Sequence, residues 1–171
     1  LVDLMKFAQE NPGVATVGHS GTGGSWHLSA ATLAQAHGAS FNYVPFDGSA
    51  KVRTALLGRH VAVAATGADE VKQLADAGEV KILAVNATER VPAFPDTPTV
   101  AEAGYALEAP IYDWRGVAAP KGLPADVKAK LVSGVKACFD SEAFQKLAKE
   151  RGLPLVYADP DGFADFLKGM D

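Results

Sequence analysis

Short apolar runs alternate with helix-like patterns through the first half of the chain. Residues that favour strands gather in four runs, at 14–18, 41–45, 61–65 and 80–85. Between the first two runs, one helix face recurs at helical spacing: Trp26, Ala30, Leu33, Ala34 and His37. Strands that alternate with helices of about 10 to 15 residues form βαβ crossovers and a parallel sheet. The pattern therefore predicts an α/β fold in which helices flank a mostly parallel sheet.

After residue 86 the pattern changes. Prolines crowd the stretch 92–98, and Thr99 with Glu102 has the form of a capping box, which predicts a short helix. Alternating runs follow at 106–111 and 114–119 and predict one or two further strands. We expect this region to cross from one part of the molecule to another.

Three amphipathic helices are predicted near the carboxyl end. The first covers 124–140, the second covers 141–151, and the third begins at Asp159 as its N-cap. The stretch 115–171 supplies little sheet for these helices to cover. We therefore expect their apolar faces to lie exposed or to be buried against another copy of the chain.

The single cysteine, Cys138, lies in an apolar stripe of the first of these helices with Val127, Leu131 and Val135. Small thiols are often buried in such stripes, so the spacing favours a core position, and the alternative is a reactive thiol. A single cysteine excludes a disulfide framework and a CxxC pair. The four histidines lack the HxxxH or HExxH spacing of a metal site, so we expect no metal and no cofactor.

Composition narrows the class of protein. The chain has 171 residues, of which 48% are apolar and 21% are charged, as in a globular domain with a real core. Its 16 Lys and Arg against 20 Asp and Glu give a net charge of -4, and no long basic run occurs. We therefore expect no nucleic-acid partner. No apolar stretch approaches the roughly 20 residues that span a bilayer, so the chain as it stands is expected to be soluble.

A glycine-rich loop follows the first predicted strand and precedes the first long helix. Glycine lets a backbone approach a ligand closely, and the N–H groups of a first helical turn have no partner within the helix. Together they form a cradle for a small anion. The spacing matches neither a dinucleotide fingerprint nor a P-loop, and the alternative is a plain turn capped by Ser25 or Thr22. The candidate binding residues of this loop are Ser20, Gly21, Thr22, Gly23, Gly24 and Ser25.

Two more polar, glycine-containing loops follow the second and third predicted strands. In an open parallel sheet, loops at the carboxyl ends of the strands converge on one crevice, where ligands bind. None of the three loops contains Lys or Arg, so backbone N–H groups and hydroxyls would hold a carboxylate. The alternative for the third loop is simple capping, because Thr66 and Asp69 have the form of a capping box. The second loop contributes Phe46, Asp47, Gly48, Ser49 and Ala50, and the third contributes Thr66.

Together these loops resemble the Bug family, the TctC-type periplasmic receptors of tripartite tricarboxylate transporters. The resemblance runs in order along essentially the whole chain. It is carried by Asn11-Pro12-Gly13, Ser20 to His27, Val44 to Ala50, Leu83-Ala84-Val85 before Glu89-Arg90, Pro95 to Gly104, and Trp114-Arg115-Gly116 through Pro124. It implies a type II periplasmic-binding-protein-like fold in the periplasm. Such a receptor closes two lobes on a small organic carboxylate or amino-acid-like solute and docks on the membrane permease subunits of the transporter.

The resemblance also implies how the chain divides. Residues 1–13 would form a linker helix, 14–112 a complete ligand-binding lobe, and 113–171 the returning carboxyl part of the other lobe. The family's opening segment and signal peptide have no counterpart before Leu1. We therefore expect a partial second lobe, weak binding by this chain alone, and self-association through exposed helices. Relatives often carry a lysine where Asp47 stands, and Asp47 would either receive a ligand ammonium group or cap the next helix.

Two other functions share features with this sequence. The effector-sensing domain of a transcriptional regulator has the same two-lobed architecture and would need a helix-turn-helix segment upstream. A small hydrolase would use Ser20 or Ser25 as its nucleophile, with His27 and Asp47 as partners, but the Gly-x-Ser-x-Gly elbow is absent.

Overall fold

The computed structural model describes residues 1–107, 114–153 and 155–169. Contacts divide the chain into two compact units, Leu1–Trp114 and Arg115–Asp171. No helix in the described ranges is long and apolar enough to cross a membrane.

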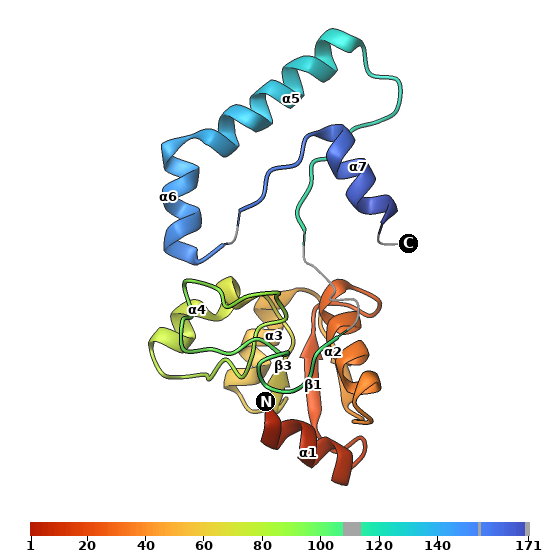
Figure 1. The fold of residues 1–171 in the computed structure, drawn as a ribbon, viewed down its shortest axis with the longest axis vertical. Coiled ribbons are helices and arrows are strands. Elements are labelled where there is room, and N and C mark those ends of the chain that lie inside the picture. Colours follow the sequence, from red (N-terminus) through yellow and green to blue (C-terminus); the bar gives the residue numbers. More distant parts are fainter. Residues whose placement is uncertain (108–113, 154, 170–171) are drawn as a thin grey trace. The chain divides into compact units, whose positions relative to one another are not determined.

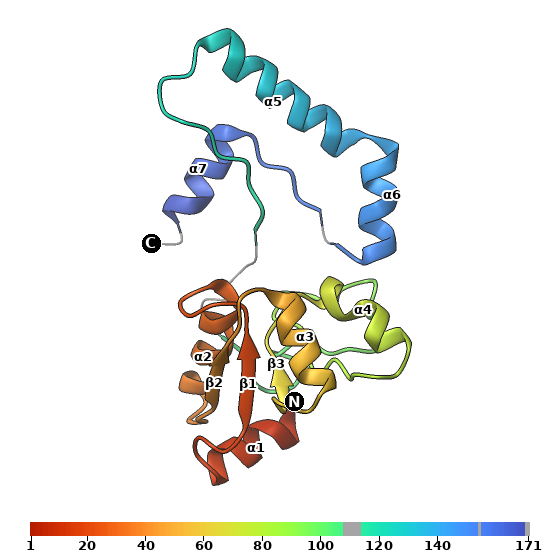
Figure 2. The same ribbon diagram turned by 180° about the vertical axis from the view of Figure 1, so that it is seen from behind.

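The first unit is built on a small parallel sheet. Its strands are β1 (Thr16–His19), β2 (Asn42–Pro45) and β3 (Val63–Ala64), in the order β2-β1-β3. Both neighbours pair with β1 in parallel. Because the strands are parallel, the chain must return to the same edge of the sheet before each new strand, and it does so through α2 and then α3 (Figure 2). The predicted α/β fold with a parallel, helix-flanked sheet is confirmed.

The described residues of this unit form four helices: α1 (Val2–Glu10), α2 (Ser25–Ala36), α3 (Ser49–Leu57) and α4 (Ala68–Asp76). Successive residues of a strand face opposite sides of a sheet. A Cβ on Gly18 would lie 3.3 Å from Val52 of α3, whereas the ring of the next residue, His19, stacks on His27 of α2. The helices α2 and α3 therefore cover opposite faces of β1 (Figure 1).

The predicted strands are shorter in the structure, and one is missing. Residues 80–85 form no strand, and Val85 makes only an isolated parallel bridge with Thr99. The Val85 N–H donates to the carbonyl of Pro98 at 3.0 Å, but proline has no N–H with which to extend the ladder. The prediction of a fourth strand there is therefore wrong.

The capping pair of this region forms, although the helix does not. The Thr99 hydroxyl accepts from the Glu102 N–H at 3.1 Å, and the Glu102 carboxylate accepts from the Thr99 N–H at 2.8 Å. Residues 100–104 make a turn and not a helix. The hydrogen bond from the Thr99 N–H, together with Arg90 beside the carboxylate, lowers the pKa of Glu102.

The second unit consists of α5 (Ala125–Asp140), α6 (Glu142–Arg151) and α7 (Pro160–Lys168). The predicted cap of α7 forms, because Asp159 accepts from the Gly162 N–H at 2.8 Å. Helix α6 also has a cap, which was not predicted: Ser141 accepts from the Phe144 N–H at 3.3 Å. Residues 114–119 form no strand, so that prediction is wrong. Most of the other predicted run, 106–111, lies outside the described residues.

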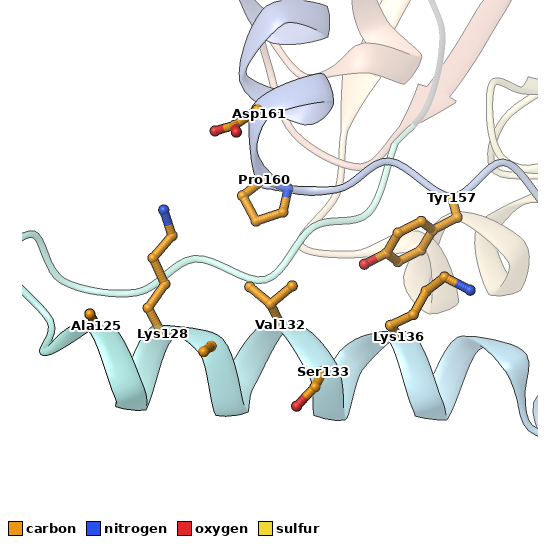
Figure 3. A pocket seen from close by; sticks show the side chains of 9 residues that line it. Ala125, Lys128, Val132, Ser133, Lys136, Tyr157, Pro160 and Asp161 are labelled. Atoms are coloured by element: carbon orange, nitrogen blue, oxygen red, sulfur yellow. The ribbon is translucent and has the colours of Figure 1, made fainter.

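One face of α5 packs toward the segment that leads into α7. Figure 3 shows Val132 and Pro160 facing one another across a hollow of ≈ 600 Å³, with the Lys136 ammonium 5.1 Å from the centre of the Tyr157 ring. None of the described residues of α5 is buried. The segment that leads into α7 therefore covers one side of α5 without burying any of its described residues.

A second stripe of α5 lies open. Val127, Leu131 and Val135 are all exposed, and together with Cys138 they line another shallow hollow. Cys138 itself is exposed, so the prediction of a buried core thiol is wrong. The stripe has the spacing of a core face, but within the described residues no element covers it.

We expect this open stripe of α5 to bind a hydrophobic dye. Replacing Leu131 with Lys should reduce dye fluorescence and any concentration-dependent sedimentation, because a charge interrupts the apolar stripe. The control is Val156→Lys, which alters a residue that is 90% exposed and lies outside the stripe. Equal loss of fluorescence in both variants would contradict the stripe as the source.

Candidate functional site

The three candidate loops leave the sheet at one edge. Gly18 of β1 is in register with Val44 of β2 and with Ala64 of β3. The pairing continues for one residue beyond the strands. There the Phe46 N–H donates to the backbone carbonyl of His19 at 2.8 Å, and the Ala65 N–H donates to the backbone carbonyl of Gly18 at 2.9 Å. All three strands therefore end at one level, and each of the loops leads directly into a helix (Figure 2).

The first loop turns sharply on its glycines. Gly21 has φ 104° and Gly23 has φ 79°, and the Gly24 N–H donates to the Gly21 carbonyl at 3.3 Å. Helix α2 begins at Ser25 with Gly24 as its N-cap, and no side chain caps it. The alternative in which Thr22 or Ser25 caps the helix is therefore wrong. The first-turn N–H groups of α2 keep no partner from a cap and point out of the helix end.

The second loop places Gly48 at the N-cap of α3, with φ 94° and ψ 153°. Ser49 and Ala50, which were predicted to contact ligand, form the first turn of this helix. The ring of Phe46 packs over β1, because a Cβ on Gly18 would lie 3.2 Å from its Cε2 atom. Phe46 thus forms an apolar base for the loop.

Asp47 neither caps the helix nor stands unpaired. Its Oδ2 atom lies 3.0 Å from the ammonium of Lys51, one helical turn further on. No side chain caps α3, so the capping role predicted for Asp47 is wrong. Lys51 thus places a positive charge close to the loop, although the loop itself has a carboxylate at Asp47. Both side chains are largely exposed, and such surface ion pairs contribute little to stability.

The third loop closes on Glu70. Thr66 donates its hydroxyl hydrogen to the Glu70 carboxylate, which also accepts from the Gly67 N–H at 3.2 Å. Gly67 is the N-cap of α4, so the capping arrangement lies one residue later than the predicted pair of Thr66 and Asp69. The Thr66 hydroxyl hydrogen is therefore already used within the protein.

Two histidines beneath the first loop were not predicted to act on it. The ring of His19, which is 1% exposed, lies with Nδ1 3.0 Å from the Gly21 carbonyl oxygen. The Nδ1 atom of His27 accepts from the Gly23 N–H at 3.1 Å. The four-residue spacing of Gly23 and His27 is a local signal that sequence analysis could have used, whereas the stacking of His27 on His19 is a tertiary contact.

Burial lowers the pKa of His19 from its ordinary value of 6.5. The Gly21 carbonyl opposes this shift, and the neighbouring His27 adds to it. The folded protein therefore favours the neutral ring more strongly than the unfolded chain does. Because the folded pKa is depressed, the stabilising contribution is full above pH 6.5 and is lost as the pH falls through the folded pKa.

We expect the free energy of unfolding to fall as the medium is acidified from about pH 7.5 to about pH 5, in part through His19. In the variant His19→Asn, the amide can still donate to the Gly21 carbonyl but does not titrate. Its unfolding free energy should fall less steeply over this range in urea titrations. Parallel curves for the two proteins would refute a contribution from His19.

Comparison with known proteins shows which family the chain resembles. The family model described as the tripartite tricarboxylate transporter family receptor, TctC, matches residues 1–169. A UPF0065 protein of Pseudomonas sp. (strain P51), from the tcbD-tcbE intergenic region, is 30% identical over 98% of this chain and 50% of its own length.

Solved structures show the same likeness. Rpa4515 of R. palustris with adipate superposes with a TM-score of 0.89 at 28% identity, over 99% of this chain and 56% of that one. The periplasmic binding protein BugD superposes with a TM-score of 0.84 at 30% identity, over 99% and 57%. The chain spans about half the length of the curated relatives it matches. With the family model covering nearly every residue, this chain belongs to the TctC family of tripartite tricarboxylate transporter receptors.

Proposed function

We propose that this chain captures a small organic carboxylate as the solute-binding component of a tripartite tricarboxylate-type transporter. The observation that carries the proposal is the meeting of three polar loops at one edge of the sheet, each leading into a helix N-terminus. The proposed ligand-binding residues are those of the loops 20–25 and 46–50, with Thr66 as a third contact. The structure of the relative Rpa4515 with adipate supports a carboxylate ligand.

Helix geometry explains how an acidic chain would hold an anion. Each helix N-terminus stabilises a nearby negative charge by about 0.3 to 1 kcal/mol, and by up to about 2 kcal/mol where it is partly buried. The N-termini of α2, α3 and α4 would together contribute a few times that amount. The net charge of -4 is spread over the chain and does not prevent a local positive potential at this edge.

We further propose that the loops form one wall of a two-sided site. In this proposal, 14–112 is a ligand-binding lobe and 113–171 is part of the other lobe, with 1–13 as a linking helix. The coverage of about half of each relative supports this division. A ligand held by one wall should bind in the millimolar range, whereas a micromolar complex corresponds to about 8.2 kcal/mol. Self-association would proceed through the open stripe of α5.

The proposed setting is the periplasm, with permease subunits in the membrane as partners. BugD, whose fold this chain shares, is a periplasmic binding protein. An amino-acid-like solute remains an alternative ligand, because Asp47 would attract an ammonium group. Its pairing with Lys51 makes a simple carboxylate the better candidate.

The test is a titration of the isotope-labelled 171-residue chain with adipate, followed by nuclear magnetic resonance. The amide signals of the loops 20–25 and 46–50 should shift together with one millimolar dissociation constant. Hexane-1,6-diol, which has the same carbon chain without charge, is the control and should shift none of them. Shifts scattered over both units, or equal shifts with the diol, would contradict a carboxylate site at this edge.

A further inference from the structure

Two hydrogen bonds to histidine rings set which backbone groups of the first loop face a ligand. The Gly21 carbonyl oxygen accepts from Nδ1 of His19 at 3.0 Å and from the Gly24 N–H at 3.3 Å. Because His19 is buried, this carbonyl is directed at a ring inside the protein and not at the loop's open side. A carbonyl oxygen turned the other way would repel an anion in the loop.

The second bond engages an N–H group of the same loop. The Gly23 N–H donates to Nδ1 of His27 at 3.1 Å. An N–H group can only donate, so Nδ1 of His27 must carry a lone pair, whereas Nδ1 of His19 must carry a hydrogen to reach a carbonyl. The two rings thus hold opposite tautomeric roles, and each one binds a different glycine of the loop.

Both rings are held in place by aromatic contacts. Their centres lie 4.5 Å apart at an angle of 23°, and Tyr43 of β2 stands edge-on to His27 at 5.0 Å. The Tyr43 hydroxyl donates to the Ala30 carbonyl of α2 at 3.4 Å. The imidazoles therefore cannot turn without disturbing contacts to both β2 and α2.

We propose that His19 and His27 are positioning residues that orient the loop 20–25 for anion binding. His19 turns the Gly21 carbonyl inward, and His27 takes up the Gly23 N–H. The donors left for a carboxylate are then the first-turn N–H groups of α2 and not the N–H of Gly23. This inference rests on the proposed carboxylate function, but the two bonds can be tested without ligand.

Three variants of His27 distinguish the effect of losing the hydrogen-bond acceptor from the effect of losing the aromatic ring. In His27→Asn, the side-chain oxygen can take the place of Nδ1 and accept from Gly23. In His27→Gln, the oxygen stands one bond further out, and His27→Leu has no acceptor. Without ligand, the wild-type chain should show a nitrogen–nitrogen coupling across the bond between Gly23 and His27. The Gly23 amide should exchange with solvent about tenfold faster in the Leu and Gln variants than in wild type, and within about threefold of wild type in the Asn variant.

Binding of adipate gives the second readout. The Leu and Gln variants should bind about tenfold more weakly, while the Asn variant should stay within about threefold of wild type. Thermal unfolding of all three variants, followed in parallel, identifies any loss that is due to unfolding alone. An Asn variant as impaired as the Leu variant would overturn the proposal, as would a wild-type His27 with a hydrogen on Nδ1. If the wild-type chain does not bind adipate, the proposed function fails. The rate at which the Gly23 amide hydrogen exchanges with solvent then still tests the role of His27.

Discussion

Replacing Gly23 with Val will remove the response of the chain to adipate and leave the sheet folded. Gly23 has φ 79°, a backbone region in which a β-branched residue is an outlier. A Cβ built on Gly23 meets no atom within 4 Å, so the substitution acts through the backbone and not through a clash. Such a residue costs about 1 to 3 kcal/mol, and relief of that strain moves the N–H groups that open α2. Titration followed by amide shifts should show at least about tenfold weaker binding, since about 1.4 kcal/mol corresponds to a factor of ten.

The matched control is Gly78→Val. Gly78 has φ 73° and also has no atom within 4 Å of a built Cβ, but it follows the carboxyl end of α4, away from the loops. The backbone strain should therefore be the same in both variants, with similar losses of stability in urea. Only Gly23→Val should lose the shifts in the loops. A Gly23→Val protein that binds adipate as wild type does would refute the glycine loop as part of the site.

Replacing Met5 with Ala will destabilise the first unit by about 2 to 5 kcal/mol. Met5 lies on α1 and is 0% exposed, as is Ala8 one turn later on the same face. The substitution removes buried apolar atoms and leaves a cavity, and both effects reduce the free energy of unfolding. Such a loss is a large part of the total stability of a small unit, which is about 5 to 15 kcal/mol. Equilibrium unfolding in urea measures it directly.

Val2→Ala provides the comparison within the same helix. Val2 is 53% exposed, so its truncation should change the unfolding free energy by no more than about 0.5 kcal/mol. A large difference between the two variants would place α1 within the cooperative core of the first unit. Equal, small losses would instead mean that α1 is only a linking helix that packs weakly.

Much of the local architecture follows from residues close together in the chain. Asp159 was predicted as a helix cap and forms that bond, because a cap requires only a side chain and an N–H group two or three residues away. Ser141 caps α6 in the same local way. Thr99 and Glu102 form their reciprocal bonds for the same reason, even though no helix follows. The glycine loop after β1 was likewise visible from its composition.

Predictions that depended on distant partners were less accurate. The run 80–85 has strand-forming residues, but the segment opposite it includes Pro98, which cannot extend a ladder. Cys138 has the spacing of a core position and is nevertheless exposed, because burial depends on an element that covers the stripe. A pattern in one segment does not contain that information.

The α/β class, the order of the loops that lead into helices and the family resemblance could all be inferred from the sequence. These features reside in local spacing and in order along the chain. The position of β1 between β2 and β3, which brings the three loops to one edge, became visible only in the folded chain. It also placed His27 on His19 and Tyr43, beneath the glycine loop. Strand order and ring stacking could not be inferred in this way, because they depend on packing between segments that are distant in the chain.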